Sequence, residues 1–390
     1  MAKMTRNTGL LMIPGPTPLA DEVYDALGSE MFSFADPRFA QVFREALAMT
    51  QDMLGNPEEV YIIPGSGLFA MEIALTNCVQ PGEKILIINQ GYFGDRFSQI
   101  ANAYGIEYEE VKAEWGTRVD PQEVAQALAK GGFKAVTLTH VDTSVGVLAD
   151  FATLIPLIKE SGSLLIVDGV CATAAVEESF TKGYGANKAN IDVLLTAGQK
   201  AIGCPPGLAI VAFSPDALAA RAAMPKIPAY FGDINNWRIV MKEPGRAFGT
   251  PPVSMINAYH AALKLVYQEG LEVRYQRHER YGKAMRAALR ALGLTVLAGE
   301  EVAAPTISCV LYPEGIVDAE FRKALAAKGM MIAGAMSRMS GKAFRIGHMG
   351  STTPQMLEQA IALLGETLNE MGFSADGATA VAVLQAKLFC

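Results

Sequence analysis

The sequence is poor in cysteine, and its five cysteines are scattered, with no two spaced as Cys-x-x-Cys. This odd, dispersed set argues against a disulfide framework and against a zinc knuckle, and we expect no metal site. Reduced thiols fit a cytoplasmic location. The apolar run of residues 10–13 is cut short by Pro14, so we expect no signal peptide.

Clusters of positive charge and long uncharged stretches are also missing. The formal net charge is -7 and no Lys/Arg cluster stands out, which makes nucleic acid and anionic membrane surfaces poor partners. No uncharged stretch approaches the length of a membrane span. Apolar residues are abundant instead, at 51% against 19% charged, which is a globular composition. A chain of 390 residues exceeds the usual size of one core, so we expect two lobes.

The first part of the chain alternates short apolar runs with amphipathic helical segments, for example over residues 121–130 and 153–159. Apolar runs without polar alternation suit a parallel sheet that is covered on both faces. Together with the intervening helices they give the βαβ pattern of an α/β sheet. The runs span residues 84–88, 135–139, 164–167, 193–195 and 209–213.

The pattern changes after about residue 254. We predict a large domain of residues 1–253, which includes an N-terminal arm, and a second part of residues 254–390, made of an interdomain helix and a smaller α+β domain. The clearest helix of the second part should begin at Pro354 and end before Gly372, because proline suits a first turn and glycine the position past the end. After Phe373 we expect a terminal helix or arm. The other elements expected there are one long helix, straight or bent, over residues 256–292, a helix over residues 318–328 and strands over residues 307–311 and 344–347.

Polar side chains and glycines follow four of the apolar runs directly. Ligands of open parallel sheets bind outside the carboxyl ends of the strands. Four such ends that meet at one rim therefore predict a ligand site. The segments concerned are residues 89–94, 140–143, 168–169 and 196–200.

Lys200 and Asp168 are the most reactive candidates at this rim. A lysine in an apolar pocket has a lowered pKa and can form a Schiff base, although a surface lysine at a strand end is an equal interpretation. Asp168 follows a buried run, where a carboxylate more often caps a turn, but it also suits a pyridinium nitrogen that must stay protonated. The interval between them leaves room for a helix and a strand, so the two should reach one ring from neighbouring strands.

Three further features suit a flat ligand that carries a phosphate. Gly65-Ser66-Gly67 precedes a helix whose backbone amides can cradle a phosphate, although many helix starts look alike. Phe93 lies between glycines and can stack on a ring, with ordinary packing as the alternative. Arg345 lies in a strand-like run of the second domain and can pair with a carboxylate through two bonds. A salt bridge between the lobes would explain Arg345 equally well.

These motifs together resemble the class V aminotransferases, and more narrowly the group of alanine–glyoxylate, serine–glyoxylate and serine–pyruvate aminotransferases. The resemblance covers most of the chain. Its specificity lies in the number of matches in family order, since no single match is specific. The matching segments are residues 14–17, 65–67, 91–96, 140–146, 167–170, 198–200, 249–253 and 345–350.

The resemblance implies a transferase of fold type I, the aspartate-aminotransferase type, dependent on pyridoxal 5'-phosphate (PLP). The fold would be α/β, with a mainly parallel sheet in the large domain, and the active unit a homodimer with shared sites. Lys200 would hold PLP as a Schiff base and shuttle a proton, Asp168 would pair with the pyridine nitrogen, and Arg345 would clamp the substrate carboxylate. The other implied PLP contacts are Phe93 and Val170 on the ring faces, Thr143 at the ring hydroxyl, and Ser66, Gly67, Leu68, Gln199 and the second subunit's Thr250 at the phosphate.

The implied reaction is transamination of a small amino acid, alanine or serine, with glyoxylate or pyruvate. Two departures leave the donor open: relatives often carry Thr or His where this chain has Leu68-Phe69, and a His-Arg pair where it has Phe34-Ala35. A related subgroup that transaminates pyridoxamine shares the ending of residues 345–350, so a pyridoxamine–pyruvate reaction is an alternative.

Other classes of function are further alternatives. A PLP lyase such as cysteine desulfurase needs a cysteine in a mobile loop, and Cys309 lies in an apolar, strand-like run. A nucleotide-binding dehydrogenase would carry Gly-x-Gly-x-x-Gly after a strand, and no such motif is found. A catalytically dead binding module is disfavoured because both Lys200 and Asp168 are retained.

Overall fold

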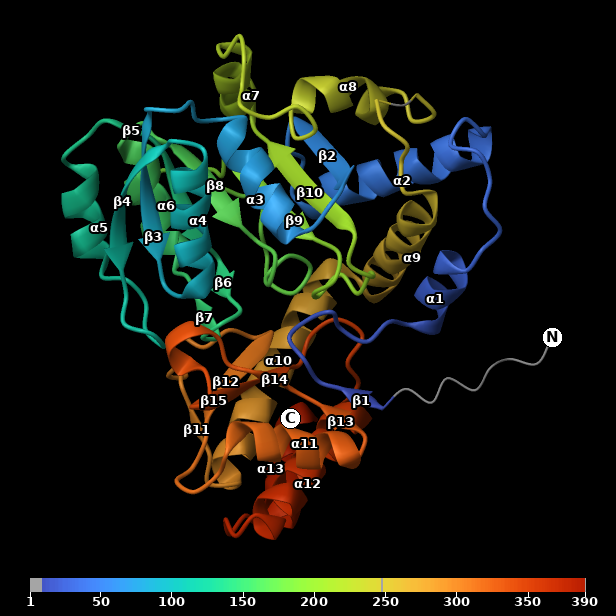
Figure 1. The fold of residues 1–390 in the computed structure, drawn as a ribbon, viewed down its shortest axis with the longest axis vertical. Coiled ribbons are helices and arrows are strands. Elements are labelled where there is room, and N and C mark those ends of the chain that lie inside the picture. Colours follow the sequence, from blue (N-terminus) through green and yellow to red (C-terminus); the bar gives the residue numbers. More distant parts are fainter. Residues whose placement is uncertain (1–8, 247, 390) are drawn as a thin grey trace.

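The structure is a computed structural model that describes residues 9–246 and 248–389. It has two lobes, each with its own sheet and apolar core (Figure 1). We call the lobe built on a seven-stranded sheet the large lobe, and the lobe built on a four-stranded sheet the small lobe. This is the α/β architecture that the sequence predicts.

The sheet of the large lobe is mainly parallel. Five adjacent strands run parallel to their neighbours, whereas β10 runs antiparallel to both β9 and β2. Including residues 209–213 in the parallel set was therefore wrong, because a strand buried on both faces has the same apolar pattern in either direction. In sheet order the strands are β2 (Glu59–Pro64), β10 (Leu208–Phe213), β9 (Val193–Ala197), β8 (Leu164–Asp168), β5 (Phe133–Thr139), β3 (Lys84–Asn89) and β4 (Glu107–Lys112).

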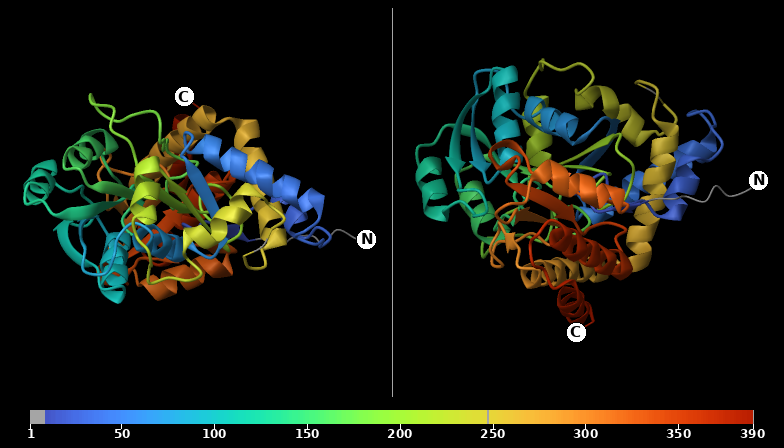
Figure 2. Two further views of the ribbon diagram at one scale, coloured as in Figure 1. Left: turned by 90° about the horizontal axis from the view of Figure 1, so that it is seen from above. Right: turned by 60° about the horizontal axis from the view of Figure 1, so that its bottom comes forward.

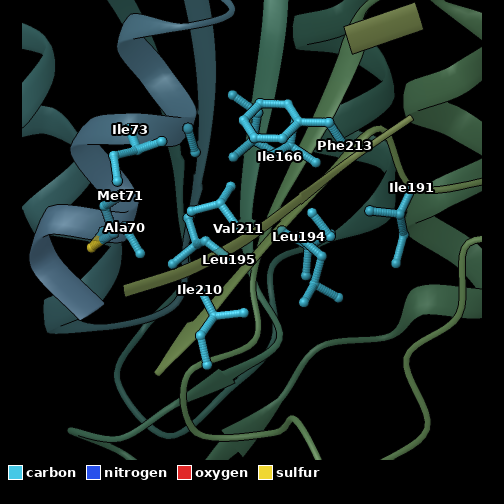
Figure 3. Packing of buried hydrophobic residues seen from close by; sticks show 14 of the residues in the cluster. Ala70, Met71, Ile73, Ile166, Ile191, Leu194, Leu195, Ile210, Val211 and Phe213 are labelled. Carbon is cyan, nitrogen blue, oxygen red and sulfur yellow. The ribbon is translucent and has the colours of Figure 1, made fainter. Parts of the chain in front are cut away.

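Helices cover both faces of this sheet (Figure 2). All residues of β9 and β10 are consequently buried. Figure 3 shows how one helix, α3, packs Ala70, Met71 and Ile73 beside Leu195 and Val211 of the sheet. The helices of the large lobe are α1 (Asp21–Leu27), α2 (Pro37–Met53), α3 (Gly67–Thr76), α4 (Tyr92–Ala103), α5 (Pro121–Leu128), α6 (Phe151–Glu160), α7 (Pro215–Ala222), α8 (Ile234–Lys242) and α9 (Val253–Glu269).

The small lobe packs helices against an antiparallel sheet of strands β11 (Thr295–Val296), β12 (Ile307–Leu311), β15 (Ala343–Gly347) and β14 (Ala333–Gly334). A separate two-stranded sheet adds a strand from the start of the described chain, because β1 (Leu10–Leu11) pairs in parallel with β13 (Met330–Met331) of the small lobe. The remaining elements are α10 (Leu271–Ala291), α11 (Asp318–Ala327), a short 3-10 helix at Ser337–Met339, α12 (Pro354–Glu370) and α13 (Gly377–Leu388).

The predicted helix over residues 256–292 is two helices. Gly270, with φ 84°, separates α9 from α10, a backbone conformation that favours glycine. Glu269 closes the bend by pairing with Arg274 at 2.6 Å and with Arg277 at 2.5 Å. Since α9 packs on α1 and α2 whereas α10 packs on α13, the bend also marks the passage from one lobe to the other. The domain division at residue 253 stays a prediction.

The final helices follow the sequence more closely. Helix α12 starts at Pro354, as predicted, with the Thr353 side chain accepting from the amide of Met356. Gly372, with φ 85°, lies just past its end. The predicted terminal element is α13, a helix that packs on α10 and α12.

Candidate active site

The carboxyl ends of β3, β5, β8 and β9 lie side by side, because these four strands are neighbours in the sheet and parallel. They face the small lobe (Figure 1). The four polar segments predicted to meet at one rim therefore do meet there. Asp168 ends β8 and Lys200 follows β9, so the two reach the site from adjacent strands. The segment between them, residues 169–192, crosses over without an α-helix.

Lys200 lies in a tight turn after β9 and is 9% exposed. Its Nζ donates to the carbonyl of Pro14 at 2.5 Å, and the Thr17 hydroxyl donates to the Lys200 carbonyl at 2.8 Å. A Cβ on Gly15 would lie 2.7 Å from Lys200 Cδ, so only a glycine lets this N-terminal segment pass so close. Burial lowers the pKa of Lys200, which favours the neutral amine needed for nucleophilic chemistry.

Asp168 is 3% exposed. One carboxylate oxygen, Oδ1, accepts from the amide of Val170 at 2.9 Å, and the other accepts from no group of the described chain. Burial raises the pKa of Asp168 to about 7, and the charges of Asp142 and Glu178 add to the effect. A cation placed against the free oxygen would lower that pKa again, because opposite charges favour the ionised form.

The Gly-rich turn of residues 65–67 lies beside these strand ends. Ser66 is the N-cap of α3 and its side chain makes no capping hydrogen bond. A Cβ on Gly67 would approach Val170 Cγ2 to 3.0 Å, so glycine allows the helix to start against the loop after Asp168. The first amides of a helix have no partner within it and attract anions. Ser66 is exposed, and Leu68 is 45% exposed.

Gln199 precedes Lys200, and its side-chain Oε1 is buried without a hydrogen-bond partner in the described chain. A buried polar atom without a partner is costly in a folded protein. The oxygen and nitrogen of such an amide are exchanged by a 180° flip, so this position can present a donor to an anion. The unpartnered amide indicates a ligand beside Lys200.

Phe93 is fixed by a residue to which the sequence assigned no role, Asp142. The Asp142 carboxylate is fully buried and accepts from the Phe93 amide at 2.9 Å and from the Ser144 hydroxyl at 2.5 Å. A Cβ on Gly91 would lie 2.6 Å from Asp142 Cγ. Asp142 belongs to a small hairpin, β6 (Val141–Asp142) with β7 (Val147–Leu148). The order Asp-Thr-Ser after a strand could have revealed it, since Asp accepts from a Ser two residues on.

A second buried carboxylate missed by sequence reasoning is Glu178, which is 2% exposed. It lies 2.7 Å from Nδ1 of His140 and also accepts from the Thr173 hydroxyl at 2.5 Å. His140 in turn donates its backbone amide to the carbonyl of Asp168 at 2.9 Å. The hydrogen-bonded group of Glu178, Thr173 and His140 thus holds the backbone of Asp168 in place.

Arg345 reaches the site from β15 of the small lobe. Its Nε donates to the carbonyl of Gly334 at 3.0 Å and its Nη1 to the carbonyl of Thr143 at 3.2 Å. No acidic side chain of residues 9–246 and 248–389 pairs with it, and Nη2 donates no hydrogen bond there. Burial lowers the pKa of Arg345. The guanidinium therefore bridges the lobes through carbonyl groups, not through the salt bridge considered above, and one edge stays free for an anion.

Thr250 and Cys309 are two further positions that the sequence singled out. Thr250 is exposed and makes no hydrogen bond to the other predicted site residues within the described chain. Cys309 is the middle residue of β12, fully buried, and burial raises its pKa to about 12. A buried thiol in a strand is no mobile nucleophile, which removes the sequence basis for a desulfurase.

The fold, with Lys200 and Asp168 at adjacent strand ends, defines a class of protein, the PLP-dependent enzymes of fold type I. The solved structure of pyridoxamine–pyruvate aminotransferase from Mesorhizobium loti is similar, with a TM-score of 0.91, 27% identity and coverage of 100% of this chain and 99% of that one. A family model described as Aminotransferase class-V matches residues 21–343. The chain therefore belongs to the class V aminotransferases, as the motifs predict, and is an enzyme.

Several known proteins are similar in sequence to this chain over almost its whole length. An uncharacterized aminotransferase of Methanocaldococcus jannaschii is 33% identical, covering 93% of this chain and 94% of its own. The L-aspartate–glyoxylate aminotransferase of Paracoccus denitrificans is 30% identical, covering 96% and 95%. Others are named alanine–glyoxylate or serine–glyoxylate aminotransferases.

The residues present fit PLP, the cofactor of this family. The buried lysine matches an aldehyde, and the aspartate with one free oxygen matches a pyridine nitrogen. The helix start at Ser66 and the unpartnered amide of Gln199 both match a phosphate. Separately, none of the helices in the two described ranges combines the length and the apolar character that crossing a membrane requires.

Proposed function

We propose that this protein transfers the amino group of a small amino acid, alanine or serine, to a small 2-oxo acid, glyoxylate or pyruvate. The observation that carries the proposal is Arg345, a half-buried guanidinium that bonds only to carbonyl groups of the described chain and keeps one edge free. Donor and acceptor share a carboxylate, and a guanidinium binds a carboxylate through two bonds. One arginine can thus serve both half-reactions. The names of the relatives supply alanine, serine, glyoxylate and pyruvate as candidate substrates.

In this proposal the chain's own residues position the substrate and move protons. PLP, when bound, supplies an electron sink. Lys200 would hold it covalently and then, as a neutral amine favoured by burial, accept and return a proton at Nζ. Asp168 would accept the pyridine N–H with its free oxygen. Arg345 would orient the carboxylate over the Lys200 turn, since its charge is close enough to act on the pKa of Lys200.

The remaining cofactor contacts stay predictions. Phe93 and Val170 would lie against the two faces of the ring and Thr143 at its hydroxyl. The location of Val170 beside Gly67 and the anchoring of the Phe93 amide by Asp142 support this arrangement. The phosphate would lie at Ser66, Gly67, Leu68 and Gln199.

We also propose a homodimer in which the second subunit's Thr250 completes the phosphate site. Support comes from an apolar patch next to Ser66: Leu68, Phe231 and Tyr230 are 45%, 42% and 77% exposed. Phe231 stacks on Phe69 of α3 with ring centroids 5.9 Å apart. Exposed apolar patches of this kind mark interaction sites.

Sedimentation can test the dimer with a matched pair of variants. Tyr230→Glu should dissociate the protein and weaken retention of PLP on dilution. Val317→Glu, at a 53% exposed apolar position on the small lobe, should leave both unchanged. A wild-type monomer that retains full activity would contradict the dimer.

A second donor, pyridoxamine, is supported by the similarity to the Mesorhizobium loti enzyme over the whole chain and by Leu68, which offers no polar side chain where relatives often have one. Pyridoxamine differs from alanine and serine because it has no carboxylate for Arg345 to bind. A cytoplasmic location also stays a prediction, supported by the four described cysteines, which form no disulfide.

A screen of half-reactions tests the proposed function. The PLP-loaded protein is mixed with alanine, serine, aspartate or pyridoxamine, and conversion to the pyridoxamine form is followed by absorbance. Alanine or serine should convert the protein fastest, and glyoxylate or pyruvate should reverse the change. Conversion by pyridoxamine alone would identify pyridoxamine as the donor in place of alanine or serine. No conversion by any of these amines would refute the proposed function.

A further inference from the structure

A cavity of about 560 Å³ lies away from the active site. Its walls come from the loop after β8, from α10 and from α13, and none of its lining residues is a predicted site residue. Helix α10 is the element that runs from the junction of the lobes into the small lobe (Figure 1). The volume falls in the range of roughly 300–1,000 Å³ that is usual for small-molecule sites.

The floor of this cavity is apolar. Leu148, Val176 and Pro305 line it, and the first two pack against a small buried apolar cluster that includes Ala175. Tyr275 adds an aromatic wall from α10, and burial, together with the charges of Glu178 and Glu177, raises its pKa. Its hydroxyl has no hydrogen-bond partner in the described chain. A ligand with an apolar body and one polar end would match these surfaces.

The rim carries more positive than negative charge. Among the acidic lining groups, Glu279 pairs with Lys283 at 2.9 Å and Glu177 pairs with Lys182. Two exposed cations of the rim, Arg280 and Lys387, have no acidic partner within the described ranges. The part of the rim that carries Arg280 and Lys387 can therefore attract an anion, whereas acidic groups lie nearer Tyr275.

We propose that this cavity binds a small amphipathic anion, a carboxylate on an apolar ring or chain, at a site separate from Lys200. The apolar body lies against Leu148, Val176 and Tyr275, and the carboxylate lies at the rim beside Arg280 and Lys387. The 2-oxo and amino acids of the proposed reaction do not meet this description, because their apolar parts are too small to fill the floor.

The probe for the test is 2-naphthoate, with the uncharged 2-naphthamide as its isostere. Binding is measured by calorimetry on the full-length, PLP-loaded protein after borohydride reduction, which blocks Lys200 irreversibly. Naphthoate should bind, and naphthamide should bind about tenfold more weakly, because the interaction of one charge pair in water is of that order.

Charge-reversal variants locate the site. Arg280→Glu and Lys387→Glu should each weaken naphthoate binding about tenfold. The control is Lys323→Glu on α11, an exposed lysine without an ion pair in the described chain, which should bind as the wild type does. Melting temperatures confirm that all three variants fold.

Three results would overturn the proposal: no naphthoate binding, equal binding of naphthoate and naphthamide, or binding that Arg345→Lys abolishes while Arg280→Glu leaves it intact. The last result would mean that naphthoate occupies the active site. Failure of the proposed aminotransferase reaction would leave this test unaffected, because reduction has already removed Lys200 from the measurement.

Discussion

The side-chain nitrogen of Lys200 donates a hydrogen bond of 2.5 Å to the carbonyl of Pro14, a residue near the start of the described chain. Gly15 makes this approach possible, because any Cβ there would lie 2.7 Å from Lys200 Cδ. The N-terminal segment thus forms one wall of the lysine's pocket and limits the access of water to it.

The first prediction concerns this wall. Gly15→Ala should lower the fraction of PLP that becomes covalently bound, because the new methyl group displaces either Lys200 or the segment above it. Borohydride reduction followed by peptide mapping measures that fraction. Gly82→Ala is the control, since Gly82 also has a positive φ, of 83°, but nothing lies within 4 Å of its Cβ position. Normal labelling of Gly15→Ala would contradict the prediction, and a label on another lysine would overturn the assignment of Lys200.

Asp168→Asn should retain PLP but lose most turnover. The amide cannot stabilise a protonated pyridine nitrogen as a carboxylate does. Charge-assisted hydrogen bonds contribute roughly 1.5–3 kcal/mol, and about 1.36 kcal/mol corresponds to tenfold in rate, so a loss of about one to two orders of magnitude is expected. Single-turnover kinetics with saturating donor provide the measurement. Glu178→Gln, which alters the support of Asp168 and not its contact, should lose less. Near-normal turnover of Asp168→Asn would exclude Asp168 from the site.

The stability of the PLP-free protein should fall as the pH rises from about 4 to about 7. Burial raises the pKa of Asp168 to about 7, whereas an unfolded Asp has a pKa of about 3.9. The folded state therefore binds this proton more tightly, and the resulting stability is fully present below the unfolded pKa and lost as the pH passes the folded one.

Melting temperatures of the PLP-free wild type and Asp168→Asn, measured across this pH range, isolate the contribution of Asp168. The variant should melt at a higher temperature than the wild type at pH 8 and show a shallower pH dependence. Parallel curves for the two proteins would show that Asp168 does not titrate in this way.

Arg345→Lys should raise KM for amino acid and oxo acid together, with covalent PLP binding and melting temperature little changed. Lysine keeps the charge but loses the two-bond geometry. A purely structural role would instead lower the melting temperature and leave both KM values intact. Arg322→Lys is the control, because Arg322 makes a two-bond pair with Asp318 on α11, outside the site. If pyridoxamine is the donor, only the KM of the oxo acid should rise.

The sequence predicted the part of the site that depends on local pattern. Continuous apolar runs followed by polar residues indicate parallel strands and their carboxyl ends, so Asp168, Lys200 and their adjacency could be inferred. The antiparallel direction of β10 could not, because its residues are buried on both faces whichever way the strand runs. A bend in the helix of residues 256–292 was an open alternative, but its position at Gly270 was hidden, because apolar residues continue at helical spacing on both sides of the glycine.

Contacts between distant residues were beyond the sequence. Nothing near Pro14 indicates that its carbonyl lies at Lys200, and nothing near Arg345 indicates that its partners are carbonyl groups of Gly334 and Thr143. Each of these depends on how the lobes pack. The supporting carboxylates Asp142 and Glu178 were missed because an acidic side chain is usually exposed.

The pairing of β1 with β13 has a consequence for synthesis on the ribosome. Leu10 is among the early residues of the described chain to emerge, and its partner Met330 is among the late ones. The carbonyl of Met12 likewise accepts a hydrogen bond from the amide of Gly347, which is also made late. The contacts of Pro14 and Thr17 with Lys200 can form once the seven-stranded sheet has been made, whereas residues 10–12 can pair only when translation is nearly finished. Stalled nascent chains should be cleaved by protease within residues 9–12 until Met330 has left the exit tunnel, and protected afterwards.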